Sequence, residues 1–110
     1  MAVTPRLLIT GTLLTDAAAT LYTVGDNVVS RVNEIILCNT DTATRTVDLH
    51  IIDSGDTLAA KNQVLDGLAL AAGETRFIGL DQVMVSGDFI QGLADVTSVV
   101  SIRASGIEVS

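Results

Sequence analysis

The side chains best suited to chemistry in this sequence are a single cysteine and a single histidine, Cys38 and His50. A cysteine nucleophile needs a base beside it and a polarising environment. Nothing in the spacing brings His50 to Cys38, because the two lie in different predicted strands. We expect Cys38, which follows the apolar residues 35–37, to be a small buried hydrophobe. One cysteine also permits no intramolecular disulfide, which is typical of folding in a reducing compartment.

Two acidic turns are the remaining candidates for a bound ion. Residues 53–56 and 39–41 could offer oxygen atoms to Ca²⁺, but neither has the spacing of an EF-hand loop. Aspartate in a turn more often accepts a hydrogen bond from its own backbone. The sequence also lacks the motifs GxSxG, GxGxxG, CxxC and HExxH and the Walker A pattern. We therefore predict that the protein is not an enzyme and has no metal site and no cofactor.

Composition predicts that β-strands build the fold. The chain has 110 residues, which is a usual length for one domain. Hydrophobic residues make up 48% of it, yet the aromatic ones are only two Phe and one Tyr. The abundant Val, Ile and Thr are β-branched and pack well in pleated sheets, whereas the long polar side chains that surface helices prefer are few. We expect an all-β chain with an aliphatic core.

The clearest strand pattern covers residues 45–53. Val47, Leu49 and Ile51 fall on one face of this segment, and polar residues alternate with them on the other. Such an alternation predicts a half-buried antiparallel strand. His50 belongs to the polar set, so we expect it to face solvent or an interface rather than the core.

Other segments predict further strands separated by turns. Residues 28–40 form the longest candidate strand, in which the polar pair at 33–34 indicates either a β-bulge or a change from exposed to buried. Residues 39–43 are interpreted as a hairpin connection, and residues 57–70 as a short strand or turn pair, with one helical turn as the alternative. Roughly seven to nine short strands predict an antiparallel β-sandwich of the jelly-roll or immunoglobulin-like kind.

The domain organisation is predicted to be an arm followed by one sandwich. Residues 1–6 hold the only proline, Pro5, which has no N–H to give to a neighbouring strand and suits an extended arm or a sheet edge. Residues 7–110 then form the single β-sandwich domain. We name Pro5, Arg6, Leu7 and Leu8 as candidate contacts to a neighbouring subunit, because an apolar run begins directly after the proline.

The surface of such a domain is predicted to favour self-association. A chain of this length buries only roughly two thirds of its surface on folding. With a mean hydropathy of +0.52 and 17% charged residues, part of the exposed remainder must be aliphatic. The net charge of −7 disfavours binding to nucleic acid and to anionic membrane surfaces, since both need clustered Lys and Arg.

The order of segments resembles that of a known group of proteins. The segments are Leu21–Val24, Ile35–Thr40, Val47–Ile51, Leu68–Thr75 and Ser105–Val109. Together they are similar to the small β-sandwich structural proteins of tailed bacteriophages, which include capsid decoration or cement proteins and head or tail accessory proteins. The resemblance extends over roughly residues 7–109 and lies in the sequence of strands and turns, not in a site.

The resemblance implies a non-enzymatic virion structural protein. Its most specific form is a capsid decoration protein that self-associates, as a trimer, binds the major capsid protein and stabilises the head lattice. Such a protein is made in the cytoplasm of the bacterial host and sits on the outer capsid surface, with no direct contact to nucleic acid or membrane. The alternatives are a tail, neck or fibre-associated structural protein, a carbohydrate- or receptor-binding β-sandwich module, and a small glycan hydrolase.

Overall fold

Eight β-strands and one short 3₁₀ helix form the fold in the computed structural model, which describes residues 2–110. The strands are β1 (Val3–Leu13), β2 (Ala19–Thr23), β3 (Val29–Asn39), β4 (Arg45–Ile52), β5 (Gln63–Leu70), β6 (Thr75–Met84), β7 (Phe89–Ala94) and β8 (Val100–Val109). The helix η1 (Ala60–Asn62) precedes β5, so the ambiguous segment 57–70 contains both a helical turn and a strand.

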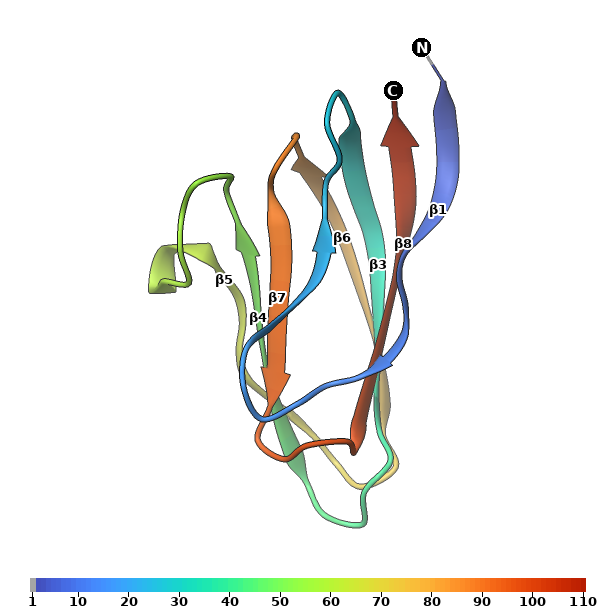
Figure 1. Ribbon diagram of the computed structural model, residues 1–110. Helices are drawn as coiled ribbons and strands as arrows, with labels where there is room; N and C mark the ends of the chain where they lie inside the picture. The colour runs from blue at the N-terminus through green and yellow to red at the C-terminus, as the bar shows by residue number, and fades with distance from the viewer. Residues whose placement is uncertain (1) are drawn as a thin grey trace.

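The strands form two four-stranded antiparallel sheets that pack face to face (Figure 1). Sheet A has the order β1-β8-β3-β6, and sheet B has the order β2-β7-β4-β5. Only β4 and β5 are consecutive strands that pair with each other; every other connection passes from one sheet to the other. This order is that of a jelly roll. The predicted antiparallel β-sandwich is confirmed, and of its two variants the jelly roll is the one observed.

The connection at residues 39–43 is not the predicted hairpin. It passes from β3 in sheet A to β4 in sheet B, so the two strands do not pair. The fully buried side chain of Asn39 fixes this crossing, because its amide donates to the carbonyl oxygens of Ala43 at 2.8 Å, Leu70 at 3.0 Å and Ala71 at 3.1 Å. The Asn39 amide thereby joins the β3–β4 connection to the β5–β6 connection, which also passes between the sheets. With the side chain bound in this way, the turn residues do not close a hairpin.

The bulge predicted for the longest strand is present. The register of β3 against β8 shifts between Val32 and Glu34, which leaves Asn33 as an extra residue. Before the bulge Ser30 and Val32 are buried, and after it the buried positions are the odd-numbered Ile35 and its successors. The extra residue therefore allows both halves of β3 to point apolar side chains into the core.

Two sequence expectations about burial are wrong. His50 is only 7% exposed, although the register of β4 with β7 stays regular from Val47 to Ile52 and leaves His50 on the outer side of the strand. The connection between β4 and β5 contains η1, which lies against β4. Cys38 is only partly buried, because it lies between the buried residues Leu37 and Asn39 and so points to the outer side of sheet A. Neither side chain has the surroundings that its sequence neighbours suggested.

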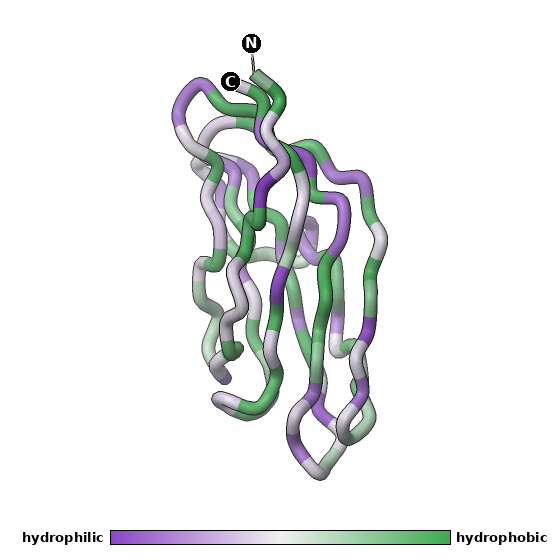
Figure 2. The backbone as a smooth tube through the Cα atoms, turned by 90° about the vertical axis from the view of Figure 1, so that its right-hand side faces the viewer, coloured by the Kyte–Doolittle hydropathy of each residue, from purple (hydrophilic) through white to green (hydrophobic). Residues whose placement is uncertain are grey.

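The start of the chain continues the sandwich. Val3 to Arg6 belong to β1, one of the two edge strands of sheet A, and pair with β8. Ala2 and Ser110 exchange backbone hydrogen bonds of 2.8 and 3.0 Å. Residues 3–6 of the expected arm are thus edge strand, which suits Pro5. Met1, the first residue of that arm, lies outside the described residues. Both chain ends lie side by side, and the hydropathy alternates along the strands (Figure 2).

The core between the sheets is aliphatic, as the composition predicts. Its members are Leu, Ile, Val, Met and Ala side chains from both sheets, including Ile35 and Leu37 of β3, Leu49 of β4, Ile90 of β7 and Ile102 of β8.

The backbones of β3 and β8 approach each other closely at Gly106. A Cβ added to Gly106 would collide with the carbonyl oxygen of Arg31, so this position requires glycine.

We predict that Gly106→Ala lowers the free energy of unfolding by more than about 2 kcal/mol, because the obstacle is backbone and cannot turn aside. Gly79→Ala is the matched control, since Gly79 lies in the same sheet and a Cβ there meets nothing within 4 Å. The control should change stability by less than about 1 kcal/mol. Urea denaturation of both variants measures the difference; equal stabilities would contradict the close approach.

Candidate assembly surface

The outer side of sheet A carries a continuous set of apolar side chains, here called the apolar face. It comprises Val3, Pro5, Leu7, Val29, Val83, Val85, Ile107 and Val109. The pairing places these side chains in rows across the sheet: Val3 opposite Val109 opposite Val29, and Pro5 opposite Ile107. Because side chains alternate along a strand, every second residue of each strand adds to the same surface.

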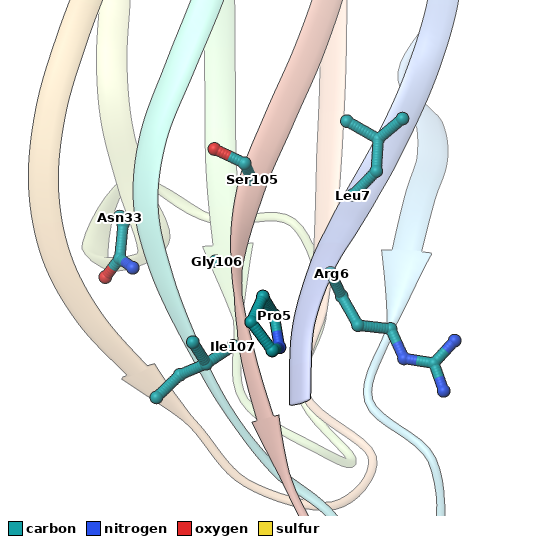
Figure 3. Close-up of a pocket in the computed structure, with 7 residues that line it drawn as sticks. All are labelled: Pro5, Arg6, Leu7, Asn33, Ser105, Gly106 and Ile107. Atoms are coloured by element: carbon teal, nitrogen blue, oxygen red, sulfur yellow. The ribbon is translucent and has the colours of Figure 1, made fainter. Parts of the chain in front are cut away.

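The apolar face is exposed and hollowed. Val3 is 61% exposed and Val85 52%. A depression of about 480 Å³ lies against β1 and β8, where Gly106 and Ser105 contribute little bulk between the side chains of Pro5, Leu7 and Ile107, as Figure 3 shows. A second hollow of about 150 Å³ lies beside it, lined by residues that include Val29, Val83 and Val109.

The apolar face is poor in charge, while Glu34 and Arg103 lie farther along the outer side of sheet A, on β3 and β8. Within the apolar face the charged side chain is Arg31, and its Nε lies 3.2 Å from a carboxylate oxygen of Asp81. Sheet B and the loops around it hold many of the carboxylates, including Asp48, Asp53, Asp56, Asp66 and Asp95. The net charge of −7 is therefore carried mainly elsewhere than on the apolar face.

A polar cluster lies directly beneath the apolar face. The hydroxyl of Tyr22 on β2 donates to Glu108 Oε2 at 2.5 Å and lies 2.5 Å from Ser30 Oγ, which is fully buried. Arg6 Nε lies 2.8 Å from Glu108 Oε1. The cluster joins sheet B to three strands of sheet A, since Arg6, Ser30 and Glu108 come from β1, β3 and β8. Each of these three stands between two residues that point outward.

The cluster holds Tyr22 in its neutral form. Burial, and then the hydrogen bond to Glu108, raise the pKa of Tyr22 from 10.0 to about 12. Both causes disfavour the charged phenolate, which would be poorly solvated there and would face a carboxylate. At neutral pH the hydroxyl is therefore a stable link between the sheets.

The four residues predicted as subunit contacts occupy three different environments. Pro5 and Leu7 are exposed on the apolar face, whereas Leu8 is only 7% exposed and packs in the core. Arg6 points away from Pro5 and Ile107 toward its partner in the polar cluster (Figure 3). Whether Pro5 and Leu7 touch another subunit stays a prediction.

Sequence reasoning missed most of the apolar face. Its members on β3, β6 and β8 are separated from those on β1 by up to 106 residues, between Val3 and Val109, and single strands do not show that they share a surface. The signal that exists is the alternation in the last strand, where Ile107 and Val109 flank Glu108. Only the strand order brings this alternation beside Val29 and Val83.

Residues 2–110 can also be compared with the requirements of a metal ion and of a membrane-spanning helix. These residues contain no group of three or more His, Cys, Asp or Glu side chains placed to hold a metal ion. The described part of the chain also contains no helix with the length and apolar character needed to cross a membrane.

Comparisons with known proteins concern the fold. No family model and no curated protein matches the sequence. A chain from Bacillus endospore appendages, which are disulfide-linked pili, is similar with a TM-score of 0.58 at 14% identity, over 98% of this chain and 88% of that chain. A chain from the T13 particle of infectious bursal disease virus is similar with a TM-score of 0.56 at 10% identity, over 97% of this chain and 30% of that chain.

A chain from the Gx strain of the same virus gives a TM-score of 0.51 at 12% identity, over 97% of this chain and 32% of that chain. This chain thus spans about a third of the length of those viral chains. At such identities the likeness shows a shared sandwich fold and nothing finer. It agrees with the jelly-roll strand order derived from the pairing.

We predict that Tyr22→Phe lowers the free energy of unfolding at pH 7 by about 1–2 kcal/mol, because it removes a hydrogen bond to a charged group and leaves Ser30 without that partner. Thr23→Val, at an exposed position of the same strand, should change stability by less than about 0.5 kcal/mol. Chemical denaturation measures both. A Tyr22→Phe variant as stable as the wild type would show that the cluster does not hold the sheets together.

The same cluster predicts a loss of stability at alkaline pH. The pKa of Tyr22 is about 12 in the folded chain and 10.0 without these interactions, so its contribution is present below pH 10 and lost as pH rises toward 12. Tyr22 is the only tyrosine and there is no tryptophan. Tyrosinate absorbance therefore reports this group alone. It should appear near pH 12 in folded protein and near pH 10 in denaturant; a folded-state midpoint near 10 would contradict the prediction.

Proposed function

We propose that this protein is a non-enzymatic structural subunit of a virus particle, specifically a decoration protein on the outer capsid surface of a tailed bacteriophage. It self-associates as a trimer, binds the major capsid protein and stabilises the head lattice. The observation that carries the proposal is the apolar face. A small, acidic domain that leaves part of one sheet surface aliphatic and hollowed suits a protein that works bound to others.

The fold supports a role in an assembly. Jelly rolls are common in viral capsid domains, and the neighbours described above come from a virus particle and from pili. The order of strands and turns also resembles the small sandwich proteins of phage virions. In such a role many copies engage one lattice, and multivalency strengthens weak individual contacts by roughly 10²- to 10⁴-fold.

A fibre-associated or tail subunit on the same fold is the second candidate. The pilus chain is similar over 88% of its length, whereas the viral chain is similar over 30%. This sandwich therefore corresponds to nearly the whole of a chain that forms pili, which supports a role in a fibre. This candidate shares self-association with the first and differs from it in location.

The carbohydrate-binding alternative has less support. Sugar sites commonly use aromatic rings as flat surfaces for stacking. This chain has no tryptophan, and the hydroxyl of Tyr22 is engaged in the polar cluster. Phe77, at 63% exposure, is the aromatic side chain most open to solvent.

We predict that the purified protein is a trimer that binds virions. Light scattering after gel filtration should give about 34 kDa, three times the 11.4 kDa subunit. Electron microscopy of the cognate phage, with the protein labelled, should place it on the head at regular positions. Label on the tail would favour the second candidate, and protein absent from purified particles would contradict both.

A further inference from the structure

A reactive pair of residues lies in β5, where Gly67 directly follows Asp66. This is the only position in the sequence at which glycine follows an aspartate or an asparagine. Glycine, which has no side chain, offers the least hindrance when its backbone nitrogen attacks the carboxyl group of the preceding residue. We infer that Asp66 is a covalent modification site, at which the chain isomerises to isoaspartate, and that the carboxylate of Asp48 restrains this reaction in the folded protein. The inference goes beyond the proposed function and does not depend on it.

The reaction rearranges the backbone without changing its mass. The Gly67 nitrogen attacks Cγ of the protonated Asp66 carboxyl group and forms an N–C bond. One carboxyl oxygen leaves as water, together with the carboxyl proton and the amide proton. A water molecule then adds to the carbon of the Asp66 main-chain carbonyl, and the bond from that carbon to the nitrogen breaks. The nitrogen recovers a proton and stays bound to Cγ, so the chain now runs through the former side chain.

Asp66 and Gly67 form a β-bulge opposite Asp48. The register of β4 against β5 shifts between Val47 and Leu49, so two residues of β5 lie opposite one residue of β4. Gly67 has a φ of 60°, which glycine adopts without strain and which is common in bulges. Both bulge residues are exposed at the edge of sheet B, where β5 lies beside β4 (Figure 1). Water therefore reaches the reactive pair.

A hydrogen bond holds the group that must move in the reaction. The Gly67 N–H donates to Asp48 Oδ1 at 2.6 Å. In an extended strand the nitrogen of the next residue lies away from the side chain, so ring closure needs a large rotation about the Asp66 Cα–C bond. This rotation turns the Gly67 N–H away from Asp48. The hydrogen bond therefore has to break before the nitrogen can reach Cγ.

The strand that carries Asp48 is fixed more firmly than the strand it restrains. β4 is an interior strand, because it pairs with β5 on one side and with β7 on the other. The neighbours of Asp48 along the strand, Val47 and Leu49, are fully buried in the core. β5 is an edge strand with one partner, and such strands open locally at a lower cost in free energy. The carboxylate thus ties the exposed bulge to the best-supported part of sheet B.

Isomerisation would disturb the edge of sheet B. Isoaspartate adds one methylene group to the backbone within the bulge. On either side of the bulge, Leu65 pairs with Leu49 and Leu68 pairs with Val47. A longer backbone between Leu65 and Leu68 does not fit both pairings at once, and register decides which side chains face the core. The modification therefore weakens the attachment of β5.

The test measures isoaspartate at Asp66 over time at neutral pH, by enzymatic methylation and by peptide mass spectrometry. Asp48→Ala removes the acceptor, and Asp48→Val does the same with a side chain that favours strands, in case the alanine variant does not fold. Asp95→Ala is the matched control, since Asp95 also accepts from a backbone N–H, that of Thr46. Circular dichroism checks the fold of each variant, and wild-type protein in urea gives the unrestrained rate.

We expect both Asp48 variants to isomerise at Asp66 about three- to tenfold faster than folded wild type, because a hydrogen bond to a charged group no longer opposes local opening. Asp95→Ala should keep the wild-type rate. Asp66→Glu should form no isoaspartate in β5, since glutamate closes the larger ring far more slowly.

Three results would overturn the inference. Wild-type protein that forms no isoaspartate at Asp66 even in urea shows that this residue is not a modification site. An unchanged rate in both Asp48 variants shows that the hydrogen bond does not restrain the reaction, and a slower rate shows that Asp48 promotes it. Equal acceleration at Asp53, which precedes a serine in a different turn, shows general unfolding rather than loss of a local restraint.

Discussion

The constraint behind this structure is that a sandwich of two sheets can bury only one side of each sheet. A chain in which 48% of residues are hydrophobic has more aliphatic side chains than the inner sides of two four-stranded sheets hold. The remainder must lie outside. Here much of it gathers on sheet A, at the end of the molecule where the described chain begins and ends. Fold and surface character thus have one cause.

Polar side chains decide how the two layers stay aligned. The hydrophobic effect holds the two sheets together but does not fix their relative position, because it is not directional. Large aromatic side chains, which could restrict the packing, are few. Asn39 fixes the relative position of the sheets at one end, because it binds two connections that pass between them. Tyr22 does so at the other end, because its hydroxyl reaches from sheet B to Ser30 and Glu108 of sheet A. These two polar anchors let a core of similar aliphatic side chains specify one arrangement.

Sequence alone predicts the local features of this fold better than the long-range ones. The bulge at Asn33 is visible because a polar pair interrupts an apolar strand, and the sandwich class follows from β-branched composition. The burial of His50 is not visible in the alternation of β4, because η1 in the connection to β5 lies against that strand. The apolar face is harder still, because it combines four strands whose order follows only from crossings between the sheets.

The outer edge of sheet A has a consequence for growth. An exposed strand with free N–H and C=O groups is a template on which further chains can add, strand upon strand, without limit. In β1, Pro5 offers no N–H to such a strand, and the register shifts twice between Leu7 and Thr12, which breaks a regular ladder. Amyloid-like extension from this edge is therefore blocked. Any contact that another copy makes at this edge has to use side chains rather than a continued backbone ladder.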